Sequence, residues 1–158
     1  MAARPDAQTA LIALPGRLIA AALLAGVVGC EGDPQPRDRT ERDRLESVRI
    51  ELAASFLGGQ AKGLHRLLHG DLIVQPPEPD TPLRAEAAAD YLERLARETA
   101  VQRSELLPAA ITREGNFLLE RGTWILESGR GYQSRYMIRW TETPTGWKVV
   151  LWRWNRFR

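Results

Sequence analysis

The sequence predicts an α+β domain in which three helices come first and an antiparallel sheet follows. Two patterns along the chain indicate this fold class. Apolar residues recur at steps of three and four in the first half of the chain, and after residue 101 they alternate with polar residues. The 158 residues leave room for one domain, and 44% hydrophobic beside 27% charged residues is an ordinary balance for a globular protein.

The first two helices are expected over residues 39–57 and 61–68. Glycine often ends a helix, and Gly58-Gly59 and Gly70 follow these two segments. The buried face of the first helix is marked by apolar residues at helical spacing: Leu45, Val48, Leu52 and Phe56. The second helix is marked in the same way by Leu64, Leu67 and Leu68.

A short strand over residues 71–74 and a third helix over residues 82–98 come next, with several prolines between them. Thr81 is expected to cap this helix. Pro82 is expected at its first position, where the missing N–H of proline costs nothing. The buried side of the helix carries Leu83, Ala87, Ala88, Tyr91, Leu92 and Leu95.

Four strands joined by short glycine-bearing turns make up the rest of the chain: 103–113, 116–127, 131–142 and 146–156. Strict alternation in the last strand separates its apolar residues into two sets. Val150, Trp152 and Trp154 share one face, and Trp147, Val149 and Leu151 share the other. We therefore expect an antiparallel meander with the helices packed on one face of the sheet.

The N-terminal segment has the layout of an export signal. Arg4 and Arg17 precede an uncharged apolar run, Leu18–Val28, whose eleven residues span only about half of a ~30 Å hydrocarbon core. Small residues then lead to Cys30, the only cysteine of the chain. The string Val27-Val28-Gly29-Cys30 resembles a bacterial lipobox, where the signal is cut before a cysteine that receives a lipid.

This resemblance implies the organisation and location of the mature protein. Residues 1–29 are expected to be a lipoprotein signal peptide, residues 30–40 a flexible lipid-anchored tether, and residues 41–158 the folded domain. The lipid on Cys30 is expected to anchor the protein to a membrane of the cell envelope. The anchored surface is either the outside of the cytoplasmic membrane or the periplasmic face of an outer membrane. The alternative is that Cys30 is a buried core cysteine after an ordinary N-terminal helix.

Residues 40–156 resemble the nuclear transport factor 2-like superfamily, in particular its SnoaL-like members. Five strings in the right order carry the resemblance: residues 64–74, Ala88 to Leu92, Gly122-Thr123-Trp124, Gly146 to Val150, and Trp154-Asn155. The resemblance implies a cone-shaped roll, in which three N-terminal helices pack on a curved, mainly antiparallel sheet and leave a pocket. Many such relatives are isomerases, dehydratases or cyclases, and many others bind or assemble without chemistry.

All five tryptophans lie after residue 123, on the predicted sheet. Such a set fits an aromatic-lined pocket for an apolar or ring-bearing ligand, and it fits core packing between sheet and helices equally well. Trp147 is expected in the core. The candidate ligand-binding residues are Tyr91, Trp124, Tyr136, Trp140, Trp152 and Trp154.

Glu120 and His65 are the candidate catalytic residues. Glu120 alternates with leucines in its strand and is expected to face inward. A carboxylate in an apolar setting either pairs with an arginine, here Arg139 or Arg153, or has a raised pKa, which is the usual condition for proton transfer in catalysis. His65 is either a pocket base or a surface histidine. His65 and His69 lie four residues apart, yet no carboxylate has a recognised companion spacing. We therefore expect no metal and no cofactor.

The resemblance also weighs against isomerase chemistry. Ketosteroid isomerase relatives use an Asp base and a Tyr donor, and those positions correspond here to Pro76 and Leu52, which transfer no proton. We expect a non-catalytic domain that binds a small apolar or aromatic molecule or a partner protein. The alternatives are an isomerase, dehydratase or hydrolase using Glu120, His65 or Tyr91, and an assembly subunit that forms a homodimer through the sheet. The net charge of +2 gives no case for nucleic acid.

Overall fold

The computed structural model describes residues 36–61, 63–78, 80–129 and 131–157. The predicted signal peptide and its lipidation site, Cys30, lie outside the described residues. Pro34–Arg158 forms a compact unit that contains every described element and the whole described core, so we expect this part of the chain to fold alone. Among the described residues, no helix is long and apolar enough to cross a membrane.

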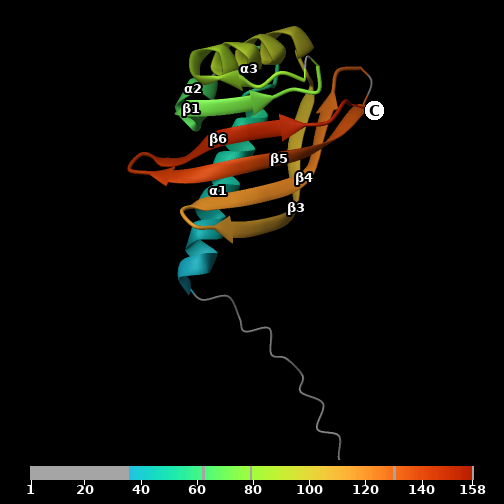
Figure 1. The fold of residues 1–158 in the computed structure, drawn as a ribbon. Coiled ribbons are helices and arrows are strands. Elements are labelled where there is room, and N and C mark those ends of the chain that lie inside the picture. Colours follow the sequence, from blue (N-terminus) through green and yellow to red (C-terminus); the bar gives the residue numbers. More distant parts are fainter. Residues whose placement is uncertain (1–35, 62, 79, 130, 158) are drawn as a thin grey trace, which may run out of the picture. The chain divides into compact units, whose positions relative to one another are not determined.

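Three helices and a six-stranded sheet make up the described part of the chain (Figure 1). The helices are α1 (Pro36–Ala54), α2 (Leu64–Leu67) and α3 (Ala85–Thr99). The strands are β1 (Leu68–Gln75), β2 (Leu83–Arg84), β3 (Arg103–Glu114), β4 (Phe117–Glu127), β5 (Gly131–Thr143) and β6 (Gly146–Trp154). The strand order is β2-β1-β6-β5-β4-β3, and every pair is antiparallel except β1 with β6. The predicted α+β class, with helices on a curved and mainly antiparallel sheet, is confirmed.

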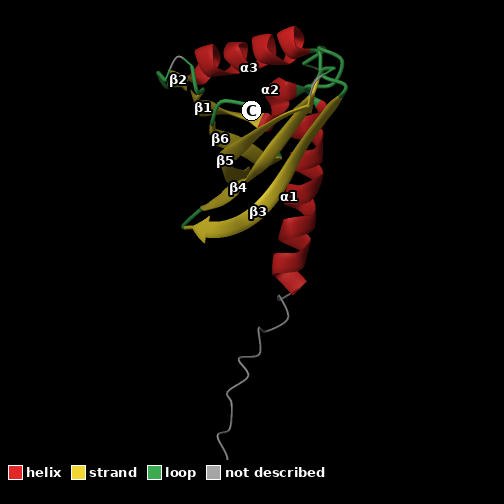
Figure 2. Ribbon diagram, turned by 90° about the vertical axis from the view of Figure 1, so that its right-hand side faces the viewer, coloured by secondary structure: helices red, strands yellow, loops and turns green. Residues whose placement is uncertain are grey.

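The helices lie on one side of the curved sheet. Figure 2 shows α1 running along one face of the strands, with α3 across the end of the sheet that carries β1 and β2. The face that α1 covers is called the inner face here, and the opposite one the outer face. Because partners in an antiparallel register share a face, the inner face carries the even-numbered residues of β4 and β5.

Helix α1 begins and ends earlier than predicted. It begins at Pro36, inside the segment expected to be a tether, and it ends at Ala54 instead of residue 57. The hydroxyl of Ser55 donates to the carbonyl oxygen of Leu52 at 2.6 Å, and Leu57 leaves the helix to form a β-bridge with Val101. Long-range pairing thus stops the helix before Gly58-Gly59.

The second helix and the first strand share a different boundary from the predicted one. The helix has only four residues, and β1 begins at Leu68, so Gly70 lies inside the strand and does not end a helix. His65 therefore lies in α2 and His69 in β1, and the two do not share a helix face. Pairing of β1 with β6 overrides the local helical spacing.

The cap predicted for the third helix is wrong. Leu83 and Arg84 form β2, pairing with Val74 and Ile73 of β1, and the helix begins at Ala85 after Arg84 as its N-cap. Thr81-Pro82 therefore precedes a strand, because an edge for pairing is available next to β1.

A register irregularity in β6 changes which side its residues face. Arg139 of β5 pairs with Leu151, but the next residue, Trp140, pairs with Val149, so Val150 is an extra residue. Val149 is fully buried and Trp147 is 4% exposed, on the inner face with Trp152 and Trp154. Strict alternation predicted that Trp147 and Val149 face the side opposite to Trp152 and Trp154. The extra residue in β6 explains why that prediction is wrong.

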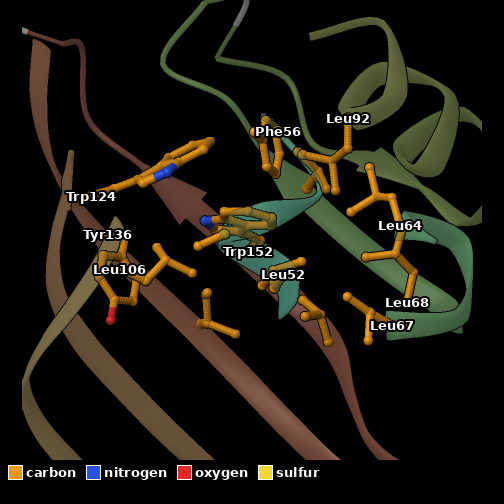
Figure 3. Packing of buried hydrophobic residues seen from close by; sticks show 14 of the residues in the cluster. Leu52, Phe56, Leu64, Leu67, Leu68, Leu92, Leu106, Trp124, Tyr136 and Trp152 are labelled. Atoms are coloured by element: carbon orange, nitrogen blue, oxygen red, sulfur yellow. The ribbon is translucent and has the colours of Figure 1, made fainter. Parts of the chain in front are cut away.

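The core lies between α1 and the inner face of the sheet. Leu52 of α1 and Phe56 of the turn after it have no exposed surface and point at Trp152 and Trp124 (Figure 3). Leu64 and Leu68 continue the cluster towards Leu92 of α3. One contiguous cluster therefore joins all three helices to the strands.

Candidate functional site

The aromatic residues expected to line a pocket lie in this core. Trp124, Trp140 and Trp152 are 0% exposed and Trp154 is 4% exposed. The Phe56 ring packs edge-on against Trp124, with centroids 5.0 Å apart, and the rings of Trp124 and Trp152 are 4.9 Å apart. The indoles fill the hollow of the sheet by packing on one another, and their ligand-binding role stays a prediction.

Tyr91, on α3, lies at the edge of the same cluster. Its ring is 6.2 Å from that of Trp154, and the Arg94 guanidinium lies 5.6 Å from its centroid. Burial raises the pKa of the Tyr91 hydroxyl, against the lowering effect of Arg94. Tyr91 therefore stays neutral at physiological pH.

Glu120 is the one fully buried carboxylate of the described residues, and it is paired. Its Oε2 accepts a hydrogen bond from Nη1 of Arg49 on α1 at 3.2 Å, and its Oε1 accepts one from the hydroxyl of Tyr136 on β5 at 2.6 Å. Arg49 is only 8% exposed. Both carboxylate oxygens are engaged by a buried network joining α1, β4 and β5.

The predicted partners of Glu120, Arg139 and Arg153, are wrong, although the partner is an arginine. Glu120 pairs with Ile138, so Arg139 lies on the outer face, where it bonds Glu114 at 3.1 Å. Arg153 pairs with Met137 and lies on the outer face too. The sequence gives no register between α1 and β4, so Arg49 was not found.

Burial and the negative charge of Glu120 raise the pKa of Tyr136 far above its ordinary value. The hydrogen bond from the Tyr136 hydroxyl to the carboxylate acts in the same direction, because it holds the proton on the tyrosine. The pair is built to keep a neutral phenol beside a carboxylate.

The two histidines make separate surface contacts. Nε2 of His65 lies 2.5 Å from Glu93 of α3, and the His65 side chain is 63% exposed. Nδ1 of His69 accepts the backbone N–H of Asp71 at 3.1 Å. In the part of the chain that the structure describes, no three His, Cys, Asp or Glu side chains gather as metal ligands would.

The three candidate catalytic side chains do not come together. Glu120 bonds Arg49 and Tyr136, His65 pairs with Glu93, and Tyr91 contacts Arg94 and Trp154. Among the described residues no hydrogen bond or ion pair joins any two of the three candidates. General acid–base catalysis needs two such groups within reach of one substrate, so this arrangement does not favour it.

An open groove lies between α1 and the edge strand β3, with a volume of about 630 Å³. We call it the α1–β3 groove. One wall is formed by α1 and the turn after it: Glu46, Arg49, Ile50, Ala53, Ala54 and Leu57. The other wall is Ser104, Glu105, Leu106, Leu107 and Pro108.

Apolar side chains with high exposure gather at this groove. Ile50 is 61% exposed, Leu107 47% and Leu57 40%, and all three line it. Polar groups are already bonded there: Ser104 accepts the indole N–H of Trp124 at 3.3 Å, and Arg49 is paired with Glu120. The groove therefore offers apolar surface beside the paired Ser104 and Arg49, and the carboxylates Glu46 and Glu105 also line it.

Sequence reasoning missed this groove, although part of its signal was present. Ala53, Ala54 and Leu57 lie three, four and seven residues after Ile50, as a second apolar stripe beside the Leu45–Phe56 stripe. The opposing wall depends on where β3 lies against α1, which periodicity does not give.

Comparisons with known proteins agree on the fold. The sequence matches no protein-family model and no curated protein. A nuclear transport factor 2-like protein with a cystatin-like fold from Novosphingobium aromaticivorans is 20% identical, with a TM-score of 0.60 over 75% of this chain and 83% of that chain. A nuclear transport factor 2-like protein of unknown function from Silicibacter pomeroyi is 11% identical, with a TM-score of 0.60 over 77% and 98%.

A domain of unknown function with a cystatin-like fold from Nostoc punctiforme is similar to the same degree. It is 13% identical, with a TM-score of 0.59 over 74% of this chain and 77% of that chain. At such identities the similarity establishes the fold alone.

Proposed function

We propose that this chain, which has the nuclear transport factor 2-like fold, is a non-catalytic binding protein, lipid-anchored in the cell envelope. Its ligand is a small, mostly apolar molecule, and its binding site is the α1–β3 groove. The observation that carries the proposal is the gathering of Ile50, Leu57 and Leu107, all well exposed, at one groove.

The size and lining of the groove support a small ligand. Its volume of about 630 Å³ lies within the ~300–1,000 Å³ that small-molecule sites occupy. Exposed apolar side chains scattered singly need no explanation, but a contiguous group marks an interaction site. A ligand that covers them removes apolar surface from water without leaving a buried polar group unpaired, because Ser104 and Arg49 keep their partners.

A non-catalytic role is supported by the state of Glu120. Its carboxylate has no exposed surface and each oxygen accepts a hydrogen bond within the core, so a substrate does not reach it in this structure. The charge of the pair is balanced by Arg49. Glu120 thus serves to fix α1 on the sheet, and α1 forms one wall of the groove.

The test is a titration of the chain from Pro34 onward with N-phenyl-1-naphthylamine, a neutral fluorescent apolar probe. Ile50→Ser and Leu107→Ser each remove part of the apolar lining, and we expect each to weaken binding about tenfold, or ~1–1.5 kcal/mol. Tyr132→Ser is the matched control, because Tyr132 is 40% exposed and lies outside the groove. Equal affinities in all three variants and in the unaltered chain would refute the groove as the site.

Lipid anchoring rests on the lipobox-like string before Cys30 and is tested separately. Between Cys30 and Pro36 the chain spans at most about 20 Å, so an anchored domain would stay near the bilayer, where apolar molecules are concentrated. With Cys30→Ala in the full chain, we expect loss of the mature-size, membrane-associated form in cell fractionation. Unchanged size and fractionation would remove the anchoring from the proposal and leave the groove untouched.

A further inference from the structure

The outer face of the sheet carries a second hollow, whose lining is basic where that of the α1–β3 groove is mainly apolar. Its volume is about 620 Å³, and arginines from three adjacent strands line it: Arg121 of β4, Arg135 of β5 and Arg153 of β6. Met137 lies between Arg121 and Arg153 in the register, because it pairs with both. Arg135 lies two residues before Met137 in β5, on the same face, and pairs with Thr123.

These three arginines are exposed and have no ion pair with any described residue. By contrast, Arg103 and Arg139 of the same sheet are paired. Arg139 bonds Glu114 at 3.1 Å and lies over the Phe117 ring, and Arg103 bonds Glu105 at 2.8 Å. Three like charges on one exposed patch repel one another weakly, and no internal contact offsets that repulsion. The cluster is therefore available to an external anion.

The spacing of the cluster suits one small oxyanion. Strands lie ~4.8 Å apart, so the Cα atoms of Arg121 and Arg153, two strands apart, are separated by about 10 Å. Arg135 stands roughly 8 Å from each of them by the same geometry. Three long side chains on such a triangle can turn their guanidinium groups towards one centre, and each presents the paired N–H donors that fit phosphate oxygens.

The rest of the lining agrees with that occupant. Thr123 offers a hydroxyl and Asn155 an amide in the lining of the hollow, and none of the described residues that line it is a carboxylate. Beside the polar groups, Met137 gives an apolar contact. A ligand that combines a phosphate with a short carbon part would use both kinds of surface.

We propose that the outer-face hollow binds the phosphate group of a small soluble phosphate ester, through Arg121, Arg135 and Arg153. The site is independent of the α1–β3 groove and of the lipid anchor. It also opposes a two-fold dimer whose axis passes through this hollow, because symmetry would then bring the two arginine clusters together without counter-charges.

The experiment is isothermal titration calorimetry of the chain from Pro34 onward with inorganic phosphate and with glycerol 3-phosphate, at low and raised sodium chloride. We expect binding of both anions, weakened by salt. Arg121→Gln and Arg153→Gln should each weaken it about tenfold or more, because a charge-assisted bidentate contact is lost. Arg84→Gln is the matched control, since it makes the same charge change at an exposed arginine of β2, outside the hollow.

Thermal unfolding separates binding from a structural role. Without phosphate, Arg121→Gln and Arg153→Gln should leave the melting temperature unchanged or raise it, because a repulsion is relieved. With phosphate, the unaltered chain should gain stability that the two variants lack. A melting temperature lowered in the variants without phosphate would assign the arginines to structure and overturn the proposal.

A parallel arm tests the source of the phosphate group. Vesicles of phosphatidylcholine, with and without phosphatidic acid, are mixed with the same chain and sedimented. Binding to the phosphatidic acid vesicles without binding of glycerol 3-phosphate would overturn the soluble ester as ligand. No binding of either free anion, or equal binding by the two variants and the unaltered chain, would overturn the proposal as well.

Discussion

Replacing Glu120 by glutamine should cost the fold about 3–5 kcal/mol, because it leaves the Arg49 guanidinium buried without a counter-charge. The change keeps the shape of the side chain, so packing is preserved and the charge alone is removed. Arg49 is only 8% exposed, so water cannot replace the lost carboxylate.

The magnitude follows from the geometry. Two unit charges 3.2 Å apart attract one another by about 5 kcal/mol at an effective dielectric constant of ~20. Desolvation of both groups offsets part of this attraction in the native pair, but in the single variant the desolvation of Arg49 remains and the attraction is gone. A domain of this size has a total stability of only about 5–15 kcal/mol, so the loss should be plain.

The assay is equilibrium unfolding in urea, followed by tryptophan fluorescence. Trp124 and Trp152 are fully buried and become exposed on unfolding, which gives a large signal. Arg49→Met and the double variant Arg49→Met/Glu120→Gln complete a mutant cycle. The double variant should be more stable than the sum of the single losses predicts, by about 1–3 kcal/mol.

Two results would refute this reasoning. If Glu120→Gln cost less than about 1 kcal/mol, the pair would be worth no more than an exposed surface ion pair. If the losses of the two single variants simply added, Arg49 and Glu120 would act independently, and the network joining α1 to β4 would have no energetic content.

Two further predictions follow from the same sheet. Gly122→Ala should destabilise the domain by about 1–3 kcal/mol or more, because the added Cβ would lie 2.1 Å from the carbonyl oxygen of Leu107; an unchanged urea midpoint would contradict this close approach. The pKa of Tyr136 is raised in the folded state. Its contribution to the free energy of unfolding is therefore complete below pH ~10, the ordinary tyrosine value, and declines as the pH rises above 10. Tyr136→Phe should therefore reduce the alkaline loss of stability between pH 10 and 12 and cost about 1.5–3 kcal/mol at neutral pH, where the hydrogen bond to Glu120 is lost; an unaltered alkaline slope would refute it.

The fold could be predicted because its signals are local. Period-two alternation and glycine turns located β3 to β6 to within about two residues at each end. The predicted stripe of Leu45, Leu52 and Phe56 is buried, although only Leu45 and Leu52 lie in α1 and Phe56 lies in the turn after it. Where pairing partners are distant, local signals failed. Thr81-Pro82 has the features of a helix cap, but β2 forms after it because β1 offers an edge there.

The site was predicted in part only. Alternation correctly turned Glu120 inward, yet its partner came from α1, and no spacing rule relates residue 49 to residue 120. The bulge at Val150 likewise follows from the pairing of β5 with β6. Trp147 is buried in the core as predicted, but alternation put it on the wrong face of the sheet. Residues that depend on register between distant segments were the ones that sequence reasoning missed.

Pro108 limits how far the edge strand β3 can pair with a strand of another molecule. β3 is an edge strand of twelve residues, long enough to recruit a strand from a neighbouring molecule. Pro108 lacks an amide hydrogen, and the ladder with β4 is irregular between Pro108 and Ala110, so this margin cannot be matched along its whole length by another strand. Extension of the sheet by a strand from a second copy is therefore disfavoured at the middle of this edge.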